Sequence, residues 1–214
     1  MTISLSDAGK RYNRDWIFRH LTYNFEAGKS YAITGPNGSG KSTLLQAIGG
    51  ALHLNEGSIQ YSENSIQTGN SGSPSVVSNE NIFSFISICA PYLEVVEEMT
   101  VKEFLGFHSQ FKPLIAAVSI DEIISIVGLG KAVNKQIRYY SSGMKQRVKL
   151  AQCIFSDVPV LLLDEPCTNL DATGIEIYNN LVLEYCKKRM VIVSSNDHHE
   201  YEFCTEKLNI MKWK

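Results

Sequence analysis

The sequence predicts an α/β protein, with a mostly parallel core sheet, an N-terminal antiparallel β subdomain and an inserted helical subdomain. Helical patterns over about 142–155 and 173–188 alternate with the apolar β runs "PVLLLD" and "MVIVSS". Strands that alternate with helices are typical of parallel sheets, and continuously apolar strands fit a sheet covered on both faces. The helical pattern of residues 92–140 indicates a lobe inserted in this core.

The composition is that of one globular domain, which we place over residues 1–214. With 44% hydrophobic residues the chain can build a core. Its formal net charge of −2 differs from the excess of positive charge that is typical of nucleic-acid-binding proteins. We find no apolar run of membrane-spanning length and no signal-peptide pattern. The five cysteines are scattered without a CxxC pair, which favours reduced thiols in a cytosolic protein.

The first 90 residues carry several short β runs. "ISLSDA", "LTYNFEAGK" and "SYAIT" are followed in "QAIGGALHLNEGSIQYSEN" by a helix end, a turn and another strand. Residues 62–81 are rich in serine, asparagine and glycine, so we expect a mobile surface loop there. "FSFISICA" then indicates a buried strand.

Two capping boxes mark helix starts in the lobe. Thr100 and Glu103 have the spacing in which a hydroxyl and a carboxylate satisfy each other's backbone N–H groups, and Ser119 and Glu122 repeat it. Apolar residues follow both pairs at helical spacing. We therefore expect at least two capped helices within residues 92–140.

A glycine-rich loop lies between the β run "YAIT" and the helical pattern "STLLQAI". It satisfies GxxxxGK[ST], in which glycines let backbone N–H groups turn inward around phosphate oxygens. Lys41 would reach the β and γ phosphates, and the Ser42 hydroxyl would ligate Mg²⁺. The predicted nucleotide-binding residues of this P-loop NTPase are Gly35, Pro36, Asn37, Gly38, Ser39, Gly40, Lys41, Ser42 and Thr43. The motif alone does not separate a kinase, a GTPase and a motor ATPase.

Two acidic residues end the apolar run "PVLLLDEP". Parallel strands bind ligands at their carboxyl ends, which is the edge where the phosphate loop also begins. Asp164 therefore suits the Mg²⁺ shell, through water. Glu165, one residue later, is positioned to take the proton from an attacking water.

The stretch "YYSSGMKQRVKLAQ" narrows the family. Ser141, Ser142 and Gly143 can cap the helix that follows them. Together with the phosphate loop, "LLLDEP" and "TNLDA", this stretch makes the chain resemble an ABC-type ATP-binding subunit over almost its whole length. The heme-exporter and the lipid- or drug-exporter subunits look most similar, particularly in "YSSGMKQRV".

The resemblance implies a shared nucleotide site. Ser141 and Gly143 match the signature motif, which in the family reaches the γ phosphate of ATP bound by a second subunit. Asn169, Leu170 and Asp171 match the loop that lines this dimer seam. The implied ligands are ATP and Mg²⁺, and the implied assembly is a homodimer or heterodimer.

The resemblance also implies further contacts. Tyr12 matches the aromatic residue that stacks on adenine, with Trp16 as a second candidate. The lobe at 92–140 matches the helical subdomain that docks on a separate membrane subunit. The expected location is cytoplasmic, peripheral on the inner face of the membrane through that subunit.

The sequence departs from the family pattern at four places. Ser142 and Met144 replace a glycine and a glutamine of the signature. Ala90 or Pro91 stands where a glutamine senses metal and membrane partner. Asn196 stands where a histidine holds the γ phosphate and the attacking water, and His198 and His199 fall past the strand end. We interpret these two histidines as surface residues.

Three functions remain open at this point. The first is an ATPase that powers transport, with Glu165, Lys41 and Asn196 as the catalytic set and with slow turnover because of Asn196. The second is a nucleotide-gated binding module with little or no turnover. The third is a small-molecule P-loop kinase, against which the signature and "TNLDA" argue.

Overall fold

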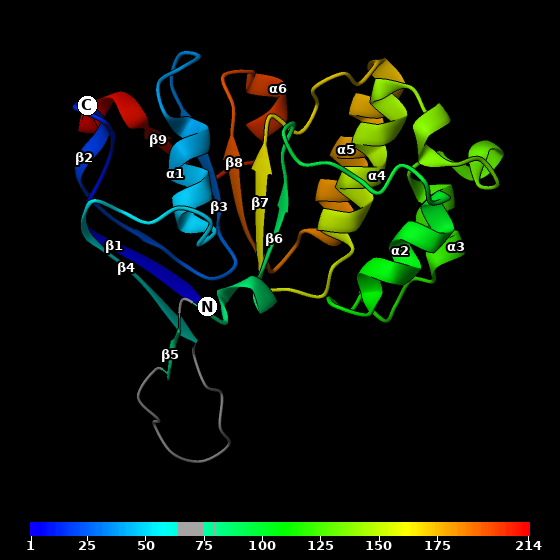
Figure 1. Cartoon of the computed structure of the whole chain (residues 1–214), viewed down its shortest axis with the longest axis horizontal. Coiled ribbons are helices and arrows are strands. Elements are labelled where there is room, and N and C mark those ends of the chain that lie inside the picture. The colour runs from blue at the N-terminus through cyan, green and yellow to red at the C-terminus, as the bar shows by residue number, and fades with distance from the viewer. Residues whose placement is uncertain (64–74, 79) are drawn as a thin grey trace. The chain divides into compact units, whose positions relative to one another are not determined.

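The computed structural model describes residues 1–63, 75–78 and 80–214 (Figure 1). The chain divides into two compact units. The first unit consists of Met1–Ile86, Pro159–Leu162 and Lys188–Lys214. The second unit consists of Ser87–Val158 and Leu163–Lys187. The single domain over residues 1–214, with a lobe at 92–140, remains a prediction.

An antiparallel sheet with the strand order β2-β1-β4-β5 forms part of the first unit. Its strands are β1 (Thr2–Tyr12), β2 (Asp15–Phe25), β4 (Glu56–Glu63) and β5 (Ser75–Val77). The antiparallel β subdomain was therefore predicted correctly, but β2 begins six residues earlier than its β run "LTYNFEAGK" indicates. Irregular pairing explains the difference, because the register of β1 and β2 shifts repeatedly and Asp7 and His20 adopt positive φ angles. Such bulges interrupt the two-residue alternation by which strands are found.

The expected loop at 62–81 lies largely outside the described residues, which omit 64–74 and 79. The expectation was wrong at residues 62, 63 and 75–77, which belong to strands, whereas residues 78, 80 and 81 lie outside helices and strands. Residues 62 and 63 belong to β4, and β5 pairs with β4 from Tyr61↔Val77 to Glu63↔Ser75. The serine-rich composition concealed a short strand whose two valines suit an antiparallel edge.

A second, five-stranded sheet has the order β6-β7-β8-β3-β9. Its strands are β3 (Ser30–Thr34), β6 (Ile86–Cys89), β7 (Val160–Asp164), β8 (Met190–Ser194) and β9 (Glu206–Asn209). β3 pairs in parallel with both β8 and β9, as a parallel core sheet requires. Every residue of β7 and β8 is buried, and α1 (Lys41–Ile48) packs on β8, which explains the continuously apolar strand sequences (Figure 1).

Four of the longer helices belong to the second unit. They are α2 (Val101–Ser109), α3 (Ile120–Ile126), α4 (Ser142–Ile154) and α5 (Ala172–Tyr185). Both predicted capping boxes are confirmed. The Thr100 backbone N–H donates to Glu103 Oε2 at 2.8 Å, and the Ser119 N–H donates to Glu122 Oε2 at 2.8 Å. The pKa of Glu103 is lowered by the backbone and then the side-chain bond from Thr100, and the pKa of Glu122 by the side-chain and then the backbone bond from Ser119.

The remaining short elements join these helices and strands. They are α6 (His198–Tyr201) and the 3₁₀ segments Ile82–Ser84, Gly130–Ala132, Ile137–Tyr139 and Ile210–Trp213. The five cysteines all lie within the described residues, and none of them forms a disulfide there. Burial raises the pKa of the Cys89 thiol well above its usual value and that of Cys204 to about 12.

A polar network joins α2 to the end of α4 inside the second unit. His108 Nε2 lies 2.9 Å from Ser156 Oγ, and His108 Nδ1 lies 3.2 Å from the Gln152 amide nitrogen. Ser156 in turn donates to the Gln152 carbonyl oxygen at 2.7 Å. The network is satisfied by a neutral imidazole that donates from Nε2 and accepts at Nδ1. Burial, and secondarily the positive charge of Lys112, lowers the pKa of His108.

This lowered pKa predicts a pH-dependent stability. The unfolded chain binds a proton on His108 at a higher pH than the folded protein does, so protonation favours unfolding. We expect the free energy of unfolding to decrease as the pH falls below about 6.5, the ordinary histidine value. Urea titrations at pH 7.5 and 5.5 should show a smaller decrease in His108→Gln than in the wild type. Replacement of the exposed His53 by glutamine is the control, and an equal pH effect in wild type and His108→Gln would contradict the prediction.

Candidate functional site

The phosphate loop leaves β3 and enters α1 within the first unit. Gly38 and Gly40 have φ angles of 74° and 98°, a region that residues with a Cβ atom rarely adopt. A Cβ atom on Gly40 would also lie 2.3 Å from Ile17 Cγ2, and one on Gly35 would lie 2.8 Å from Ser39 Oγ. Close packing therefore requires glycine at both positions, which is the backbone geometry that the motif predicts.

Lys41 and Ser39 bring polar atoms to the inside of this loop. Lys41 is only 5% exposed, and its ammonium donates to the carbonyl oxygens of Gly35 at 2.9 Å and Pro36 at 3.3 Å. Ser39 is 4% exposed, and its Oγ has no hydrogen-bond partner within the structure. A buried hydroxyl without a partner is costly unless a ligand satisfies it.

Asn196 lies beside the phosphate loop. Its side-chain amide donates to Asn37 Oδ1 at 3.1 Å, which joins the end of β8 to the loop. Asn196 therefore occupies a place next to the predicted phosphate site, although both side chains are exposed. Beyond it, Asp197 caps α6, and His198 and His199 are exposed as the sequence indicates.

The two candidate adenine-stacking residues have different surroundings. Trp16 lies against Gly9, whose added Cβ would be 3.0 Å from the indole ring. The guanidinium groups of Arg11 and Arg19 lie 5.5 and 4.5 Å from the centre of the Trp16 ring. Tyr12 is 48% exposed and has one cation near its ring, Lys10 at 5.4 Å. This difference favours Tyr12 for stacking on an adenine, because its ring remains accessible.

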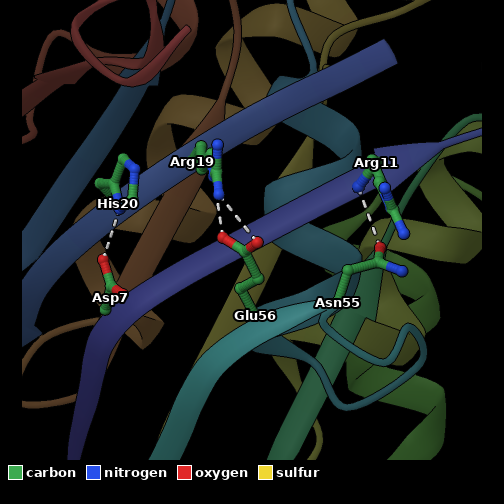
Figure 2. Close-up of polar contacts among 6 residues, drawn as sticks. All are labelled: Asp7, Arg11, Arg19, His20, Asn55 and Glu56. Atoms are coloured by element: carbon green, nitrogen blue, oxygen red, sulfur yellow. Dashed lines mark hydrogen bonds and ion pairs between the residues drawn. The ribbon is translucent and has the colours of Figure 1, made fainter. Parts of the chain in front are cut away.

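One ion pair and one hydrogen bond join residues in or next to the sheet near Trp16. Figure 2 shows Arg19 directed at Glu56, with its Nε and Nη2 atoms 2.8 and 2.9 Å from the carboxylate oxygens. The Arg11 backbone N–H donates to Asn55 Oδ1 at 3.0 Å. The Glu56 pKa is lowered by its hydrogen bond to Arg19. Trp16 is only partly exposed and lies near Arg11 and Arg19, whereas Tyr12 is exposed.

The acidic pair belongs to the second unit. Asp164 is the last residue of β7 and is 2% exposed. Glu165 adopts a φ angle of 43°, a left-handed conformation that is unfavourable for a residue with a side chain. A turn follows, in which the Thr168 N–H donates to the Glu165 carbonyl oxygen at 3.1 Å. Strained residues of this kind cluster at functional sites, so the geometry supports a chemical role for Glu165.

The signature stretch begins α4 in the same unit. Ser141 is the N-cap, and its Oγ accepts from the Met144 N–H at 3.2 Å, as predicted. A Cβ atom on Gly143 would lie 2.8 Å from the Asn169 carbonyl oxygen, so glycine permits the two segments to touch. Ser142 is exposed, which explains why a side chain is tolerated where the family has glycine.

Contacts of α4 with neighbouring loops were missed at the level of sequence. Gln146 is 3% exposed and donates to the Pro166 carbonyl oxygen at 2.8 Å. Lys149 donates to the Pro91 carbonyl oxygen at 2.9 Å, while Ala90 is fully buried. The sequence does not indicate that the glutamine in the run "MKQRV" is buried, because a capped amphipathic helix already explains the residues around it.

Among the residues that the structure describes, no group of three or more histidine, cysteine, aspartate or glutamate side chains could hold a metal ion. Within residues 1–63, 75–78 and 80–214, no helix is long and apolar enough to span a membrane.

Comparisons with known proteins agree with this geometry. A family model described as "ABC transporter" matches residues 18–168. The chain is 28% identical over 221 residues to the ABC transporter ATP-binding protein YhcH of Bacillus subtilis, covering 98% of this chain and 67% of the relative. It is 28% identical over 198 residues to the cytochrome c biogenesis ATP-binding export protein CcmA of Agrobacterium fabrum, covering 91% and 88%.

Solved structures show the same fold. A putative ABC transporter ATP-binding protein from Pyrococcus furiosus superposes with a TM-score of 0.78 at 24% identity, covering all of both chains. The dimeric bacterial ABC transporter cassette MJ0796 gives a TM-score of 0.75 at 22% identity, covering 97% of this chain and 94% of that one. At these identities the likeness establishes the fold.

Proposed function

Because this chain belongs to the ABC transporter family and is one of its ATP-binding ATPases, we propose that two copies close around two ATP molecules and drive a separate membrane subunit. A related chain could take the place of the second copy, which would make the pair a heterodimer instead of a homodimer. The observation that carries the nucleotide part is the phosphate loop, in which tightly packed glycines surround a buried lysine and a serine hydroxyl without a partner. These groups suit the oxygens of a triphosphate.

We assign the binding of ATP to residues 35–43, with Tyr12 stacking on the adenine. Lys41 would exchange its neutral carbonyl partners for the β and γ phosphates, and the attraction between opposite charges makes that contact stronger. Ser39 would donate to a phosphate oxygen. The accessible ring of Tyr12, at the end of β1, supports its assignment over Trp16.

Mg²⁺ is the proposed cofactor. The Ser42 hydroxyl and the Asp164 carboxylate would hold it, the latter through water, because this hard cation prefers oxygen ligands and keeps part of its water shell. Their oxygen donors fit such a site. When bound, the ion neutralises charge on the phosphates during transfer.

Glu165 is the proposed general base. Its carboxylate would accept a proton from the water that attacks the γ phosphorus, while the bond to the β-phosphate oxygen breaks and ADP leaves. The left-handed backbone of Glu165 supports this role, because strain of this kind is retained where side-chain placement matters.

The signature turn of one copy would complete the site of the other. Ser141 and Ser142 are exposed at the N-terminus of α4, where a helix attracts anions. Beside them, Gly143, Asn169 and Asp171 line a hollow of about 230 Å³. An exposed helix start beside a hollow supports docking against the γ phosphate that the second copy binds.

The membrane subunit would dock on the lobe at 92–140, which places the complex peripherally on the cytoplasmic face of the membrane. Exposed aromatic side chains support a protein partner here. Phe107 and Phe111 are 48% and 71% exposed with ring centres 5.1 Å apart, and Tyr139 is 72% exposed. Copurification of a membrane protein with the wild type, and its loss in Phe107→Ser/Phe111→Ser, would test this assignment.

A second candidate function is a nucleotide-gated binding module with little turnover. Asn196 favours it, because its amide is exposed and bonded to Asn37, and because an amide never carries a positive charge near neutral pH. Steady-state phosphate release separates the two functions, with Glu165→Gln as the blank. Release by the wild type at the rate of the blank would favour the binding module.

Asn196→His is expected to accelerate hydrolysis by about three- to tenfold, or ~0.7–1.4 kcal/mol of transition-state stabilisation. An imidazole reaches further than the amide and can donate to the γ phosphate, an interaction that tightens mainly in the transition state. ATP affinity should change little. The variant should also gain a pH step near the ordinary histidine pKa of about 6.5, which the wild type lacks at this position.

Replacement of the exposed His198 by asparagine is the matched control, two residues away on α6. It should leave both the rate and the pH profile unchanged. A histidine variant no faster than the wild type would show that residue 196 does not act on the transferred phosphate.

A further inference from the structure

One face of α4 bonds two different loops of the second unit. Gln146 and Lys149 are three residues apart and therefore lie on the same side of the helix. Gln146 Nε2 donates to the Pro166 carbonyl oxygen at 2.8 Å, directly after Glu165. Lys149 Nζ donates to the carbonyl oxygens of Pro91 at 2.9 Å and Ala90 at 3.5 Å, directly after β6.

The bond from Gln146 to Pro166 lies in the protein interior, where it affects the position of the loop after Glu165. Gln146 and Pro166 are both buried, and the Gln146 amide also lies 3.7 Å from Cys89 Sγ. In this low-dielectric setting a lost donor leaves a carbonyl without that partner, so the bond strongly favours one loop position.

Proline transmits this constraint to Glu165. The ring of Pro166 restricts its φ, so ψ is the one soft dihedral between the Pro166 carbonyl and the preceding peptide, and a bond to this carbonyl limits the orientations of that peptide. That peptide joins Pro166 to Glu165, whose φ of 43° is unfavourable by itself and must be held by its surroundings. The Gln146 bond to the Pro166 carbonyl oxygen therefore restrains the backbone from which the Glu165 side chain projects.

We propose that Gln146 is a positioning residue for Glu165, and that Lys149 extends its control to the loop after β6. This inference rests on the proposed role of Glu165 as general base. Ala90 has no polar side chain that could connect this loop to the site by a hydrogen bond. Lys149 bonds the backbone carbonyl oxygens of the loop instead. α4 bonds the same loop again further along the chain, because the Lys145 ammonium donates to the Glu97 carboxylate. Movement of residues 90–97 thus reaches Glu165 through α4.

The primary test compares Gln146→Met with the wild type. Methionine keeps the length and volume of the side chain but removes the donor. We expect kcat for phosphate release to fall about tenfold with KM for ATP unchanged, which is less than the ~10²-fold that a 1 Å misplacement can cost. Gln152→Met removes an amide from the same helix, where it contacts His108, and should retain the wild-type kcat.

A double-mutant cycle separates positioning from general damage. If Gln146 acts through Glu165, Gln146→Met should not slow the residual hydrolysis of Glu165→Gln any further. Lys149→Met should lower kcat by about threefold in the wild type and have no effect in the Gln146→Met background. Additive losses in either cycle, or a wild-type kcat in Gln146→Met, would overturn the inference.

Amide hydrogen exchange gives a readout that does not depend on turnover. The Thr168 and Leu170 N–H groups bond within the loop after Glu165, to the carbonyl oxygens of Glu165 and Cys167. Their exchange should accelerate in Gln146→Met, while that of α1 stays unchanged. Unchanged exchange at Thr168 and Leu170 would overturn the inference even if the protein is active. If the wild type does not hydrolyse ATP but exchange at Thr168 and Leu170 still accelerates in Gln146→Met, the positioning contact is supported and only the proposed function is contradicted.

Discussion

Lys41→Ala is expected to remove nearly all measurable ATP binding. Lys41 is the buried cation of the phosphate loop, and alanine leaves the negative charge of the triphosphate facing carbonyl oxygens of Gly35 and Pro36 instead of an ammonium. We expect the Kd for ATP to rise at least about a hundredfold, or ~2.7 kcal/mol. Isothermal titration calorimetry with Mg²⁺-ATP measures this effect directly.

Two controls define the result. Lys29→Ala removes a lysine of the same unit whose ammonium pairs with Glu26 on the surface, and it should leave the Kd unchanged. Lys41→Met retains the aliphatic part of the side chain, so it should bind ATP as weakly as Lys41→Ala while unfolding closer to the wild-type temperature. A loss of affinity below about threefold, or ~0.7 kcal/mol, would show that the nucleotide is bound elsewhere.

Glu165→Gln is expected to reduce phosphate release by about 10²–10⁴-fold and to accumulate an ATP-bound dimer. The amide keeps the shape of the side chain but cannot take the proton, so binding proceeds and hydrolysis stops. Light scattering coupled to gel filtration should report a doubled mass when Mg²⁺-ATP is present. Without nucleotide the mass should remain that of one chain.

Ser141→Arg in the Glu165→Gln background tests whether the signature turn forms the dimer seam. Ser141 is exposed at the start of α4, and arginine there adds bulk and removes the N-cap hydroxyl. We expect the ATP-dependent doubling of mass to disappear. Ser125→Arg adds the same side chain to an exposed position of α3 and should preserve the dimer. A Glu165→Gln protein that stays monomeric at high concentration with Mg²⁺-ATP would contradict the shared site.

Local signals were sufficient for several elements of this protein. The phosphate loop could be placed between β3 and α1 because glycine φ angles, a helix start and an apolar strand are encoded within about fifteen consecutive residues. The capping boxes at Thr100 and Ser119 and the cap at Ser141 were predictable for the same reason, since each bond joins residues three apart.

Elements that depend on a distant partner were harder to predict. The early start of β2 is hidden by bulges opposite β1. β5 at Ser75–Val77 pairs with β4, and β9 at Glu206–Asn209 pairs with β3, so neither has a complete pattern of its own. Pairing with a distant strand stabilises these segments, and the β propensity of the segment alone does not reveal that pairing.

By itself the sequence determined the fold class, the phosphate loop, the acidic pair and the family, because these are ordered motifs whose chemistry depends on residue type and spacing. The tertiary structure decided how those motifs are held. It showed Arg11 and Arg19 near the Trp16 ring, Asn196 bonded to Asn37, and Gln146 bonded to the Pro166 carbonyl oxygen. Each of these contacts joins residues that the chain separates, and its strength depends on burial and direction, which spacing along the sequence does not specify.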